Sequence, residues 1–350
     1  MVRFLVKLMS LEIIQKELGY TRHVISECLR CFKPTREKTQ KTFAEELSSS
    51  FNQKQKSINP KFFYDQKGSY LFKKICTLPE YYISRTEAGL LKQLDKKLPQ
   101  YLNGNFRLVE LGSGSSTKTR ILIDILEKSQ KHIEYFPIDI SNILTESCKE
   151  LQNDYKNLHI TGIIDDYESA LELIKNYDNM KNLIVFLGSS FGNYDSNIGL
   201  QFLQKINSLM KNDDLFLIGL DLVKDETVLE HAYNDSQGIT AQFNLNVLSR
   251  INSELGANFD VNKFVHYSVY NKKQSRIEMY LRSLEKQIVN IPKADLVLEV
   301  KKDELIHTEN SFKFTISQIK EMSAMSNFQI QDIWCDEKRY FGLILLSKNN

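Results

Sequence analysis

A regular alternation of short apolar runs and amphipathic stretches over residues 107–222 constrains the fold more than any other feature of this sequence. Runs of this kind are typical of strands buried on both faces, and the segments between them carry apolar residues at helical spacing. The alternation therefore predicts a parallel sheet with helices on both faces. The five predicted strands are Arg107–Leu111, Glu134–Ile138, His159–Ile164, Leu183–Leu187 and Leu215–Leu222.

The alternation stops near residue 224, where a second unit is expected to begin. A helical pattern at Thr240–Leu255 is mixed there with alternating strand patterns at His266–Tyr270 and Glu278–Arg282. Near the end of the chain, Gln329–Cys335 and Tyr340–Ser347 are typical of a hairpin that adds antiparallel strands to the edge of the main sheet. We therefore expect an α/β fold with a doubly wound sheet and a separate α+β unit.

The segment before residue 58 carries weaker signals. Apolar residues recur at helical spacing from Leu11 to Leu18 and again from Val24 to Leu29, so residues 10–32 are predicted to form one or two helices. Residues 33–58 are mostly polar and predict an exposed linker or a solvated helix. The lone Cys28-x-x-Cys31 pair has no second pair and no histidine at ligand spacing, which favours a structural role over a metal site.

Composition excludes several classes of partner. Lys plus Arg number 46 and Asp plus Glu 44, which gives a formal net charge of +2 and no field that would hold a nucleic acid. No apolar stretch has the length of a membrane span, and the five scattered cysteines are typical of a cytoplasmic chain. The six histidines form no ligand cluster, so we expect no metal.

The end of the first predicted strand indicates a nucleotide-like cofactor. The segment after Leu108 places Glu110 at the strand end, followed by Gly112 and Gly114. A phosphate-binding P-loop and a dinucleotide fingerprint both require glycine where Thr117 stands. The remaining interpretation is a cofactor without phosphates, which the backbone can approach closely at the two glycines.

Two more strand ends strengthen this interpretation. Asp139 closes the second strand, where a carboxylate can accept hydrogen bonds from ribose hydroxyls. Asp165, Asp166 and Tyr167 close the third, where an acid and an aromatic ring suit an adenine. Each acid alone is more simply a turn residue or a helix cap. Together, at consecutive ends of parallel strands, they favour an S-adenosylmethionine site.

Beyond these motifs, the chain resembles the histidine-specific Nα-methyltransferases of ergothioneine biosynthesis over roughly residues 55–350. The resemblance is collinear. The segments that carry it are Pro60–Ser69, Leu78–Glu87, Val109–Gly114, Val185–Asn193, Asp221–Asp225, Ala232–Asp235, Thr240–Asn244, Arg276–Met279 and Thr308–Phe314.

The resemblance implies an S-adenosylmethionine-dependent enzyme that trimethylates the α-amino group of L-histidine to hercynine. It also implies a Rossmann-like class I methyltransferase sheet with a second α+β substrate-binding domain. We expect a monomer that binds a small-molecule substrate and neither nucleic acid nor membrane. The expected division is an N-terminal helical extension (1–48), a substrate-binding domain in two segments (49–85 and 224–312), a methyltransferase domain (86–223) and C-terminal strands that complete it (313–350).

The same resemblance assigns residues to the site, position by position. Where the family usually has Gly-Asp-Phe, this chain has Asp165, Asp166 and Tyr167, so the adenine pocket is expected to differ in detail. Tyr64, Asn193 and Tyr233 are the candidate catalytic residues. The cofactor contacts are expected from Tyr64, Gly112, Gly114, Lys118, Asp139, Asp166 and Tyr167. The substrate contacts are expected from Tyr81, Asn193, Tyr233, Met279, Glu309 and Ser311.

Elementary chemistry is consistent with the substrate contacts. Asn193 and Tyr233 offer neutral donors to a carboxylate without a cation that would repel a quaternary amine. Glu309 and Ser311 lie two apart and share a face of an extended segment, where both can bond an imidazole. Desolvation beside a sulfonium would deprotonate the amine without a strong base. A related enzyme with another acceptor, such as tryptophan, and a binding protein without turnover remain alternatives.

Overall fold

A nine-stranded sheet runs through the computed structural model, which describes residues 19–35, 41–114, 117–141, 144–155 and 157–349. The strand order is β1-β2-β5-β4-β3-β6-β7-β14-β13. Neighbours from β2 to β7 pair in parallel, whereas β14 is antiparallel to both β7 and β13. The order reverses at β3, which lies between β4 and β6, and open α/β sheets bind ligands at the carboxyl ends of strands next to such a point.

All five predicted strands are confirmed to within two residues. They are β3 (Phe106–Leu111), β4 (Ile133–Ile138), β5 (Leu158–Ile163), β6 (Lys181–Phe186) and β7 (Leu215–Asp221). The predicted C-terminal hairpin is also confirmed, and it joins the sheet through β7. Its strands are β13 (Phe328–Cys335) and β14 (Phe341–Lys348).

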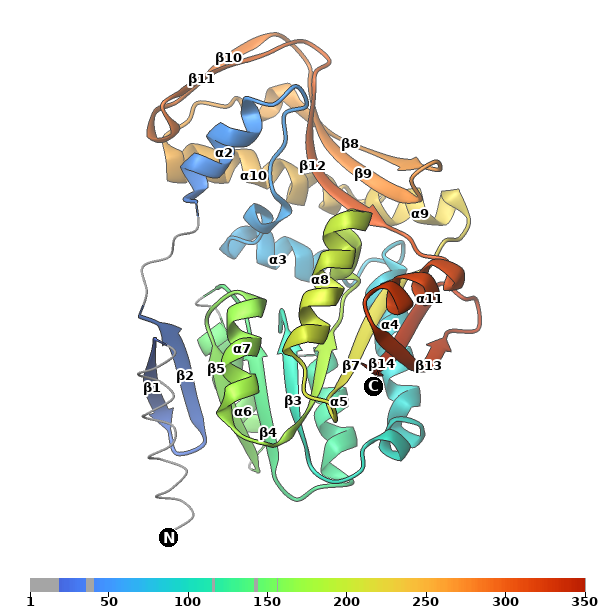
Figure 1. The fold of residues 1–350 in the computed structure, drawn as a ribbon. Coiled ribbons are helices and arrows are strands. Elements are labelled where there is room, and N and C mark those ends of the chain that lie inside the picture. Colours follow the sequence, from blue (N-terminus) through green and yellow to red (C-terminus); the bar gives the residue numbers. More distant parts are fainter. Residues whose placement is uncertain (1–18, 36–40, 115–116, 142–143, 156, 350) are drawn as a thin grey trace.

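Helices cover both faces of this sheet (Figure 1). Successive strand residues point to opposite faces, so Leu108 packs in one hydrophobic cluster and Val109 in the other. The first face is covered by α4 (Tyr82–Gln93), α5 (Thr117–Glu127) and α6 (Leu144–Asp154). The second face is covered by α7 (Tyr167–Tyr177), α8 (Ser196–Leu209) and α11 (Ile316–Met325). None of the described helices combines the length and the apolar composition that crossing a membrane requires.

A second lobe stands at one end of the molecule, above the main sheet in Figure 1. Two antiparallel sheets, β12-β9-β8 and β10-β11, pack there with helices from before and after the main sheet. The predicted helix and two strands of this region are confirmed. Its elements are α2 (Phe43–Phe51), α3 (Gln66–Ile75), α9 (Glu226–Tyr233), α10 (Ile239–Leu255), β8 (Phe264–Asn271), β9 (Arg276–Ser283), β10 (Gln287–Ile291), β11 (Leu296–Val300) and β12 (Leu305–Phe312).

Six short 3₁₀ segments of the described chain complete the connections. They are η1 (Pro60–Phe63), η2 (Leu94–Lys96), η3 (Leu98–Tyr101), η4 (Ser190–Asn193), η5 (Val261–Lys263) and η6 (Pro292–Ala294). Segment η4 lies against both β7 and β12 and so joins the main sheet to the second lobe.

The helical prediction for residues 10–32 is wrong over its described part. Residues 20–34 form a hairpin of β1 (Tyr20–Ser26) and β2 (Leu29–Pro34), and β2 pairs in parallel with β5. The helical spacing misled because Val24 and Ile25 are 63% and 39% exposed and pack no core, whereas Cys31 and Phe32 of β2 are buried. The predicted helix before residue 19 lies outside the described residues. Farther on, the polar segment predicted as a linker or solvated helix contains α2, which buries its apolar side.

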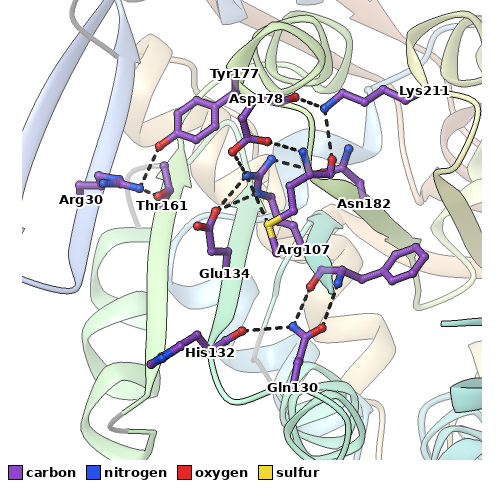
Figure 2. Close-up of polar contacts among 12 residues, drawn as sticks. Arg30, Arg107, Gln130, His132, Glu134, Thr161, Tyr177, Asp178, Asn182 and Lys211 are labelled. Carbon is purple, nitrogen blue, oxygen red and sulfur yellow. Dashed lines mark hydrogen bonds and ion pairs between the residues drawn. The ribbon is translucent and has the colours of Figure 1, made fainter. Parts of the chain in front are cut away.

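A buried arginine ties the amino ends of the central strands together (Figure 2). Arg107 of β3 is inaccessible to solvent and pairs through Nη2 with Glu134 at 2.9 Å and Asp178 at 2.6 Å. Its guanidinium also stacks over the rings of Phe136 and Tyr177, 4.3 and 5.1 Å from their centroids. This end of the sheet is thereby fixed by one charged cluster, away from the carboxyl ends where ligands bind.

Replacing Arg107 is expected to be strongly destabilising. Arg107→Met leaves two acids without their buried partner, and breaking such a pair costs about 3 kcal/mol or more. Denaturant unfolding at neutral pH measures the loss. Arg120→Met is the control, because its pair with Asp154 is 34% and 51% accessible and contributes little. A loss for Arg107→Met no larger than that of the control would contradict this account of the cluster.

Candidate active site

The carboxyl end of β3 leaves the chain in a conformation that glycine adopts easily. Gly112 has φ +74° and Gly114 φ +49°. A Cβ at Gly112 would lie 2.9 Å from the hydroxyl of Tyr167, whereas no described residue outside its chain neighbours comes within 4 Å of a Cβ at Gly114. The backbone is therefore open to a ligand at Gly114 and approached by the β5–α7 loop at Gly112.

Glu110, just before these glycines, has a structural role. Its carboxyl accepts hydrogen bonds from Thr119 at 2.7 Å and from Tyr135 at 2.5 Å. Burial raises its pKa to about 7, although both hydroxyls favour the charged form. Oε2 of Glu110 is therefore engaged inside the protein by two hydroxyl donors.

Asp139 and the β5–α7 loop lie at the two neighbouring strand ends, as predicted. Asp139 follows β4, accepts a hydrogen bond from the backbone of Ser141 at 2.8 Å, and has its pKa raised by burial. Asp166 is the N-cap of α7 and accepts from the backbone of Ser169 at 2.9 Å. The helix-cap role foreseen for a single acid thus applies to Asp166. Capping does not prevent its carboxylate from contacting a ligand, because the residue is only half-buried.

Lys118 is held by an acid from outside the glycine loop. Its ammonium lies 2.7 Å from Glu87 of α4, which is completely buried. The Glu87 carboxylate also accepts from the backbone of Gly188 at 2.8 and 2.9 Å, through its two oxygens. Lys118 therefore positions the loops after β3 and β6. The sequence held a signal for Glu87, since it lies on the apolar side of its helix between Ile83 and Leu90.

In the second lobe, two of the predicted substrate residues touch each other. The hydroxyl of Tyr233, at the end of α9, lies 2.7 Å from that of Ser311 on β12. Both residues are buried. The ring nitrogen of His266 contacts the backbone oxygen of Tyr233 at 2.8 Å, which fixes the end of α9 against β8.

A lysine that was not singled out from the sequence completes this pair. Lys313 is fully buried, and its ammonium donates to Ser311 at 2.8 Å and to Tyr233 at 3.1 Å. Its third contact is the carboxylate of Asp221 at the end of β7, at 2.8 Å. Burial alone would lower the pKa of Lys313, but Asp221 and Tyr233 outweigh it and raise the pKa.

Lys313 corrects one expectation about the site. Asn193 and Tyr233 were expected to offer neutral donors with no cation nearby, yet an ammonium lies directly behind the Tyr233 hydroxyl. The signal was available, because Lys313 follows Glu309 and Ser311 at the spacing of one face of a strand.

Glu309 differs from Glu110 in being only half-buried. Burial raises its pKa to about 7, and the only opposing influence is the charge of Lys313. Within the described part of the chain, no side chain donates a hydrogen bond to its carboxyl. Its neighbour across the sheet is Met279 of β9, and paired residues share a face, as expected for these two. A carboxyl that is partly removed from water and receives no hydrogen bond from the protein is suited to accept a hydrogen bond from a ligand.

Tyr64 connects the two halves. Although 42% of this residue is accessible, burial of the hydroxyl raises its pKa, and the nearby groups that add to the rise include Glu309, Tyr233 and Tyr167. The ring packs edge-on against Phe72 and Phe243. Tyr64 therefore lies within electrostatic reach of both the predicted cofactor side and the predicted substrate side.

Tyr81 and Asn193 flank the same place. The ring of Tyr81, just before α4, packs edge-on against Tyr233 with centroids 6.1 Å apart. Asn193 ends η4 and is exposed, and a Cβ on the preceding Gly192 would lie 3.0 Å from the backbone oxygen of Phe312. The structure thus brings Tyr64, Tyr81, Tyr233, Glu309 and Ser311 together, with Asn193 and Met279 on the adjoining elements. The described residues contain no group of acids, histidines and cysteines placed to hold a metal.

Comparison with known proteins places the chain in a family. The profile of the S-adenosylmethionine-dependent histidine-specific methyltransferases matches residues 43–348. The chain belongs to this family. Its relatives include the histidine N-alpha-methyltransferases of Mycobacterium tuberculosis (38% identical, covering 87% of this chain and 94% of the relative) and Mycolicibacterium smegmatis (36%, 83% and 90%). Ergothioneine biosynthesis protein 1 of Schizosaccharomyces pombe is 28% identical over 76% of this chain and 36% of its own length.

This methyltransferase is therefore an S-adenosylmethionine-dependent enzyme with the Rossmann-like sheet and the additional α+β elements that were expected. The strand ends fit the cofactor. The backbone at Gly114 is open to a ligand. Asp139 supplies a carboxylate whose Oδ1 accepts a hydrogen bond from the backbone of Ser141. The aromatic ring of Tyr167 lies beside the Gly112 loop, where it can cover a flat base.

The raised pKa of Glu309 predicts a pH-dependent cost in stability. The ordinary pKa of a glutamate is 4.5, and that of Glu309 in the folded protein is about 7. Between pH 4.5 and about pH 7, the Glu309 carboxyl is therefore protonated in the folded protein and ionised in the unfolded chain. The free energy of unfolding falls as the pH rises through this window. Glu309→Gln mimics the protonated acid. The free energy of unfolding of this variant, relative to that of the wild type, should therefore rise by about 3 kcal/mol from the lower to the upper end of the window. Denaturant unfolding at several pH values measures this. Glu172→Gln, on the exposed side of α7, is the control. A constant difference between Glu309→Gln and wild type across the pH range would refute the assignment.

Proposed function

We propose that this methyltransferase transfers methyl groups from S-adenosylmethionine to the α-amino group of L-histidine, forming hercynine for ergothioneine biosynthesis. The relatives named for histidine methylation and for ergothioneine biosynthesis support this acceptor. The observation that carries the proposal is Glu309, a half-buried carboxyl beside the Tyr233–Ser311 pair that receives no side-chain hydrogen bond in the described chain and whose pKa burial raises. An imidazole N–H is a donor of the kind it lacks.

In this proposal, Glu309 and Ser311 bind the imidazole, with Tyr81 and Met279 enclosing it. Tyr233 and Asn193 hold the substrate carboxylate. Because Tyr233 and Ser311 share one hydrogen bond and both accept from Lys313, only one of their two hydroxyl protons remains for a ligand. The pair is therefore restricted in what it can donate, which favours one orientation of the amino acid.

Tyr64 would hold the reacting amine. Its raised pKa keeps the hydroxyl protonated, so Tyr64 acts as a neutral hydrogen-bond partner and not as a phenolate base. The cofactor supplies an electrophilic methyl group on its sulfonium. The chain's contribution is alignment, since a hydroxyl that accepts an amine N–H directs the nitrogen lone pair away from itself. The amine loses its proton to solvent before the transfer.

On the cofactor side, we propose that Gly112, Gly114 and Asp139 contact the methionine and ribose parts. Asp166 and Tyr167 would contact adenine. Lys118 is assigned to this set through its position between the glycine loop and Gly188.

The elements also support a division into two domains. We propose that residues 49–85 and 224–312 form the substrate-binding domain, and that 86–223 and 313–350 form the methyltransferase domain. In this division, α2 lies with the substrate-binding domain from residue 43 onward, since it packs against η6. We further propose that the protein is a cytoplasmic monomer.

The acceptor can be tested directly with isotopically labelled cofactor and each of the twenty amino acids. The expected result is label on histidine alone, in products carrying one to three methyl groups. Label on tryptophan, or on several amino acids, would refute the proposed acceptor. Binding of the cofactor without transfer to any amino acid would refute the enzymatic function.

Lys313 offers a second test, of the substrate half alone. Lys313→Met removes the donor to Ser311 and Tyr233 and the charge that opposes protonation of Glu309. We expect the KM for histidine to rise about tenfold or more, the value of one lost charge-assisted bond. The acid limb of the kcat/KM profile should also move to higher pH, since the pKa of Glu309 rises.

The matched control is Lys224→Met. Lys224 also pairs with Asp221 and is nearly as buried, but it contacts neither Ser311 nor Tyr233. Both variants remove one ammonium from the same carboxylate, so both are expected to lose stability. Affinity for S-adenosylhomocysteine should stay unchanged in both. Equal effects of the two variants on the KM for histidine would show that Lys313 acts only through stability.

A further inference from the structure

The β1–β2 hairpin lies before the part of the chain that matches the family, yet it is built into the main sheet. The family profile begins at residue 43, whereas the hairpin spans residues 20–34. Strand β2 pairs with β5 from Leu29, opposite Ile160, to Phe32, opposite Ile163. The hairpin therefore runs alongside β5 to the strand's carboxyl end, where the loop to α7 begins (Figure 1).

Contacts continue from the hairpin into that loop. The backbone N–H of Ile164 donates to the carbonyl of Phe32 at 3.0 Å. The hydroxyl of Tyr20 donates to Oδ2 of Asp165 at 2.7 Å, and both residues are buried, at 6% and 2% accessibility. The other oxygen of Asp165 accepts from the backbone N–H of Asp166 at 2.9 Å. One carboxylate thus links the hairpin to the backbone of the loop.

We infer that the β1–β2 hairpin positions the cofactor loop, by which we mean the β5–α7 loop that carries Asp165 and Asp166. Tyr20 is the positioning residue, and it acts through Asp165. The inference rests on the proposed function, in which Asp166 and Tyr167 contact the adenine. Tyr20 acts on the residues assigned to the cofactor through Asp165. Its hydroxyl holds Asp165, Asp165 holds the backbone of Asp166, and the orientation of Tyr167 follows from that backbone.

A hairpin that merely covers the edge of β5 would also be expected to stabilise the fold, so stability alone cannot separate the two roles. The hairpin provides its own control at a second anchor. Arg30 of β2 donates to Thr161 of β5 and to the hydroxyl of Tyr177, each at 2.9 Å (Figure 2). Tyr177 is the last residue of α7, whereas the cofactor loop precedes its first. Loss of this anchor weakens the hairpin without touching the loop.

The experiment compares Tyr20→Phe with Arg30→Met in the full-length protein. Affinity for S-adenosylhomocysteine is measured by calorimetric titration, well below the melting temperature of both variants. We expect Tyr20→Phe to weaken binding about tenfold, as for a lost hydrogen bond to a charged group, and Arg30→Met to leave it within about twofold. The KM for histidine at saturating cofactor should stay at the wild-type value in Tyr20→Phe.

A double-mutant cycle sharpens the result. If Tyr20 acts through Asp165, then Tyr20→Phe adds little to the loss of affinity already caused by Asp165→Asn. Unchanged affinity in Tyr20→Phe, or equal losses in Tyr20→Phe and Arg30→Met, would overturn the inference.

Failure of the proposed site itself is recognised separately. Asp139→Ala is expected to weaken S-adenosylhomocysteine binding whatever the role of the hairpin. Wild-type affinity in Asp139→Ala would reject the assigned cofactor site, whereas a loss there with no loss in Tyr20→Phe would reject only the role of Tyr20.

Discussion

The proposed substrate side of the site depends on one buried carboxylate, that of Asp221 at the carboxyl end of β7. It accepts from Tyr82 at the start of α4 and pairs with both Lys224 and Lys313. Burying a carboxylate in apolar surroundings is costly, and the cost is offset only when charged partners and donors surround it. Tyr82 and Lys313 come from distant parts of the sequence, whereas Lys224 follows Asp221 by three residues. Their convergence on Asp221 fixes the end of β12, and with it Ser311 and Glu309, against the main sheet.

Much of the fold and part of the site could be predicted from local patterns. Strands buried on both faces give short apolar runs, so β3 to β7 were located to within two residues. The two-residue spacing of Glu309 and Ser311 correctly placed both side chains on one face. The β1–β2 hairpin was missed because its burial is set by β5, about 130 residues away in the sequence. Val24 and Ile25, which suggested a helix, contribute to no core.

Local sequence patterns do not identify the partners of the charged residues of the site. Glu87, Asp221 and Lys313 look like ordinary surface residues when each is considered alone, because charged side chains are rarely buried without a partner. The spacing within one element can place such a residue on a buried face, as it does for Glu87 and Lys313, but only the pairing across the fold reveals its role. Glu110 and Glu309 also differ in a way that their positions in the sequence do not reveal. Both have a pKa raised to about 7 by burial, but only Glu110 has hydroxyl donors in the described structure.

The arrangement of charge suits a reaction that creates a cation. Lys313 lies behind the hydroxyl of Tyr233, at the end of the site proposed for the substrate carboxylate, so its positive charge favours that end through the hydroxyl dipole. The negative charge of Glu309 reaches Tyr64, whose pKa it helps to raise. In the proposed function, methylation converts a neutral amine beside Tyr64 into a quaternary cation, and the negative charge of Glu309 favours that change. The same field would bind histidine in one direction only, with its amine toward the Gly112 loop.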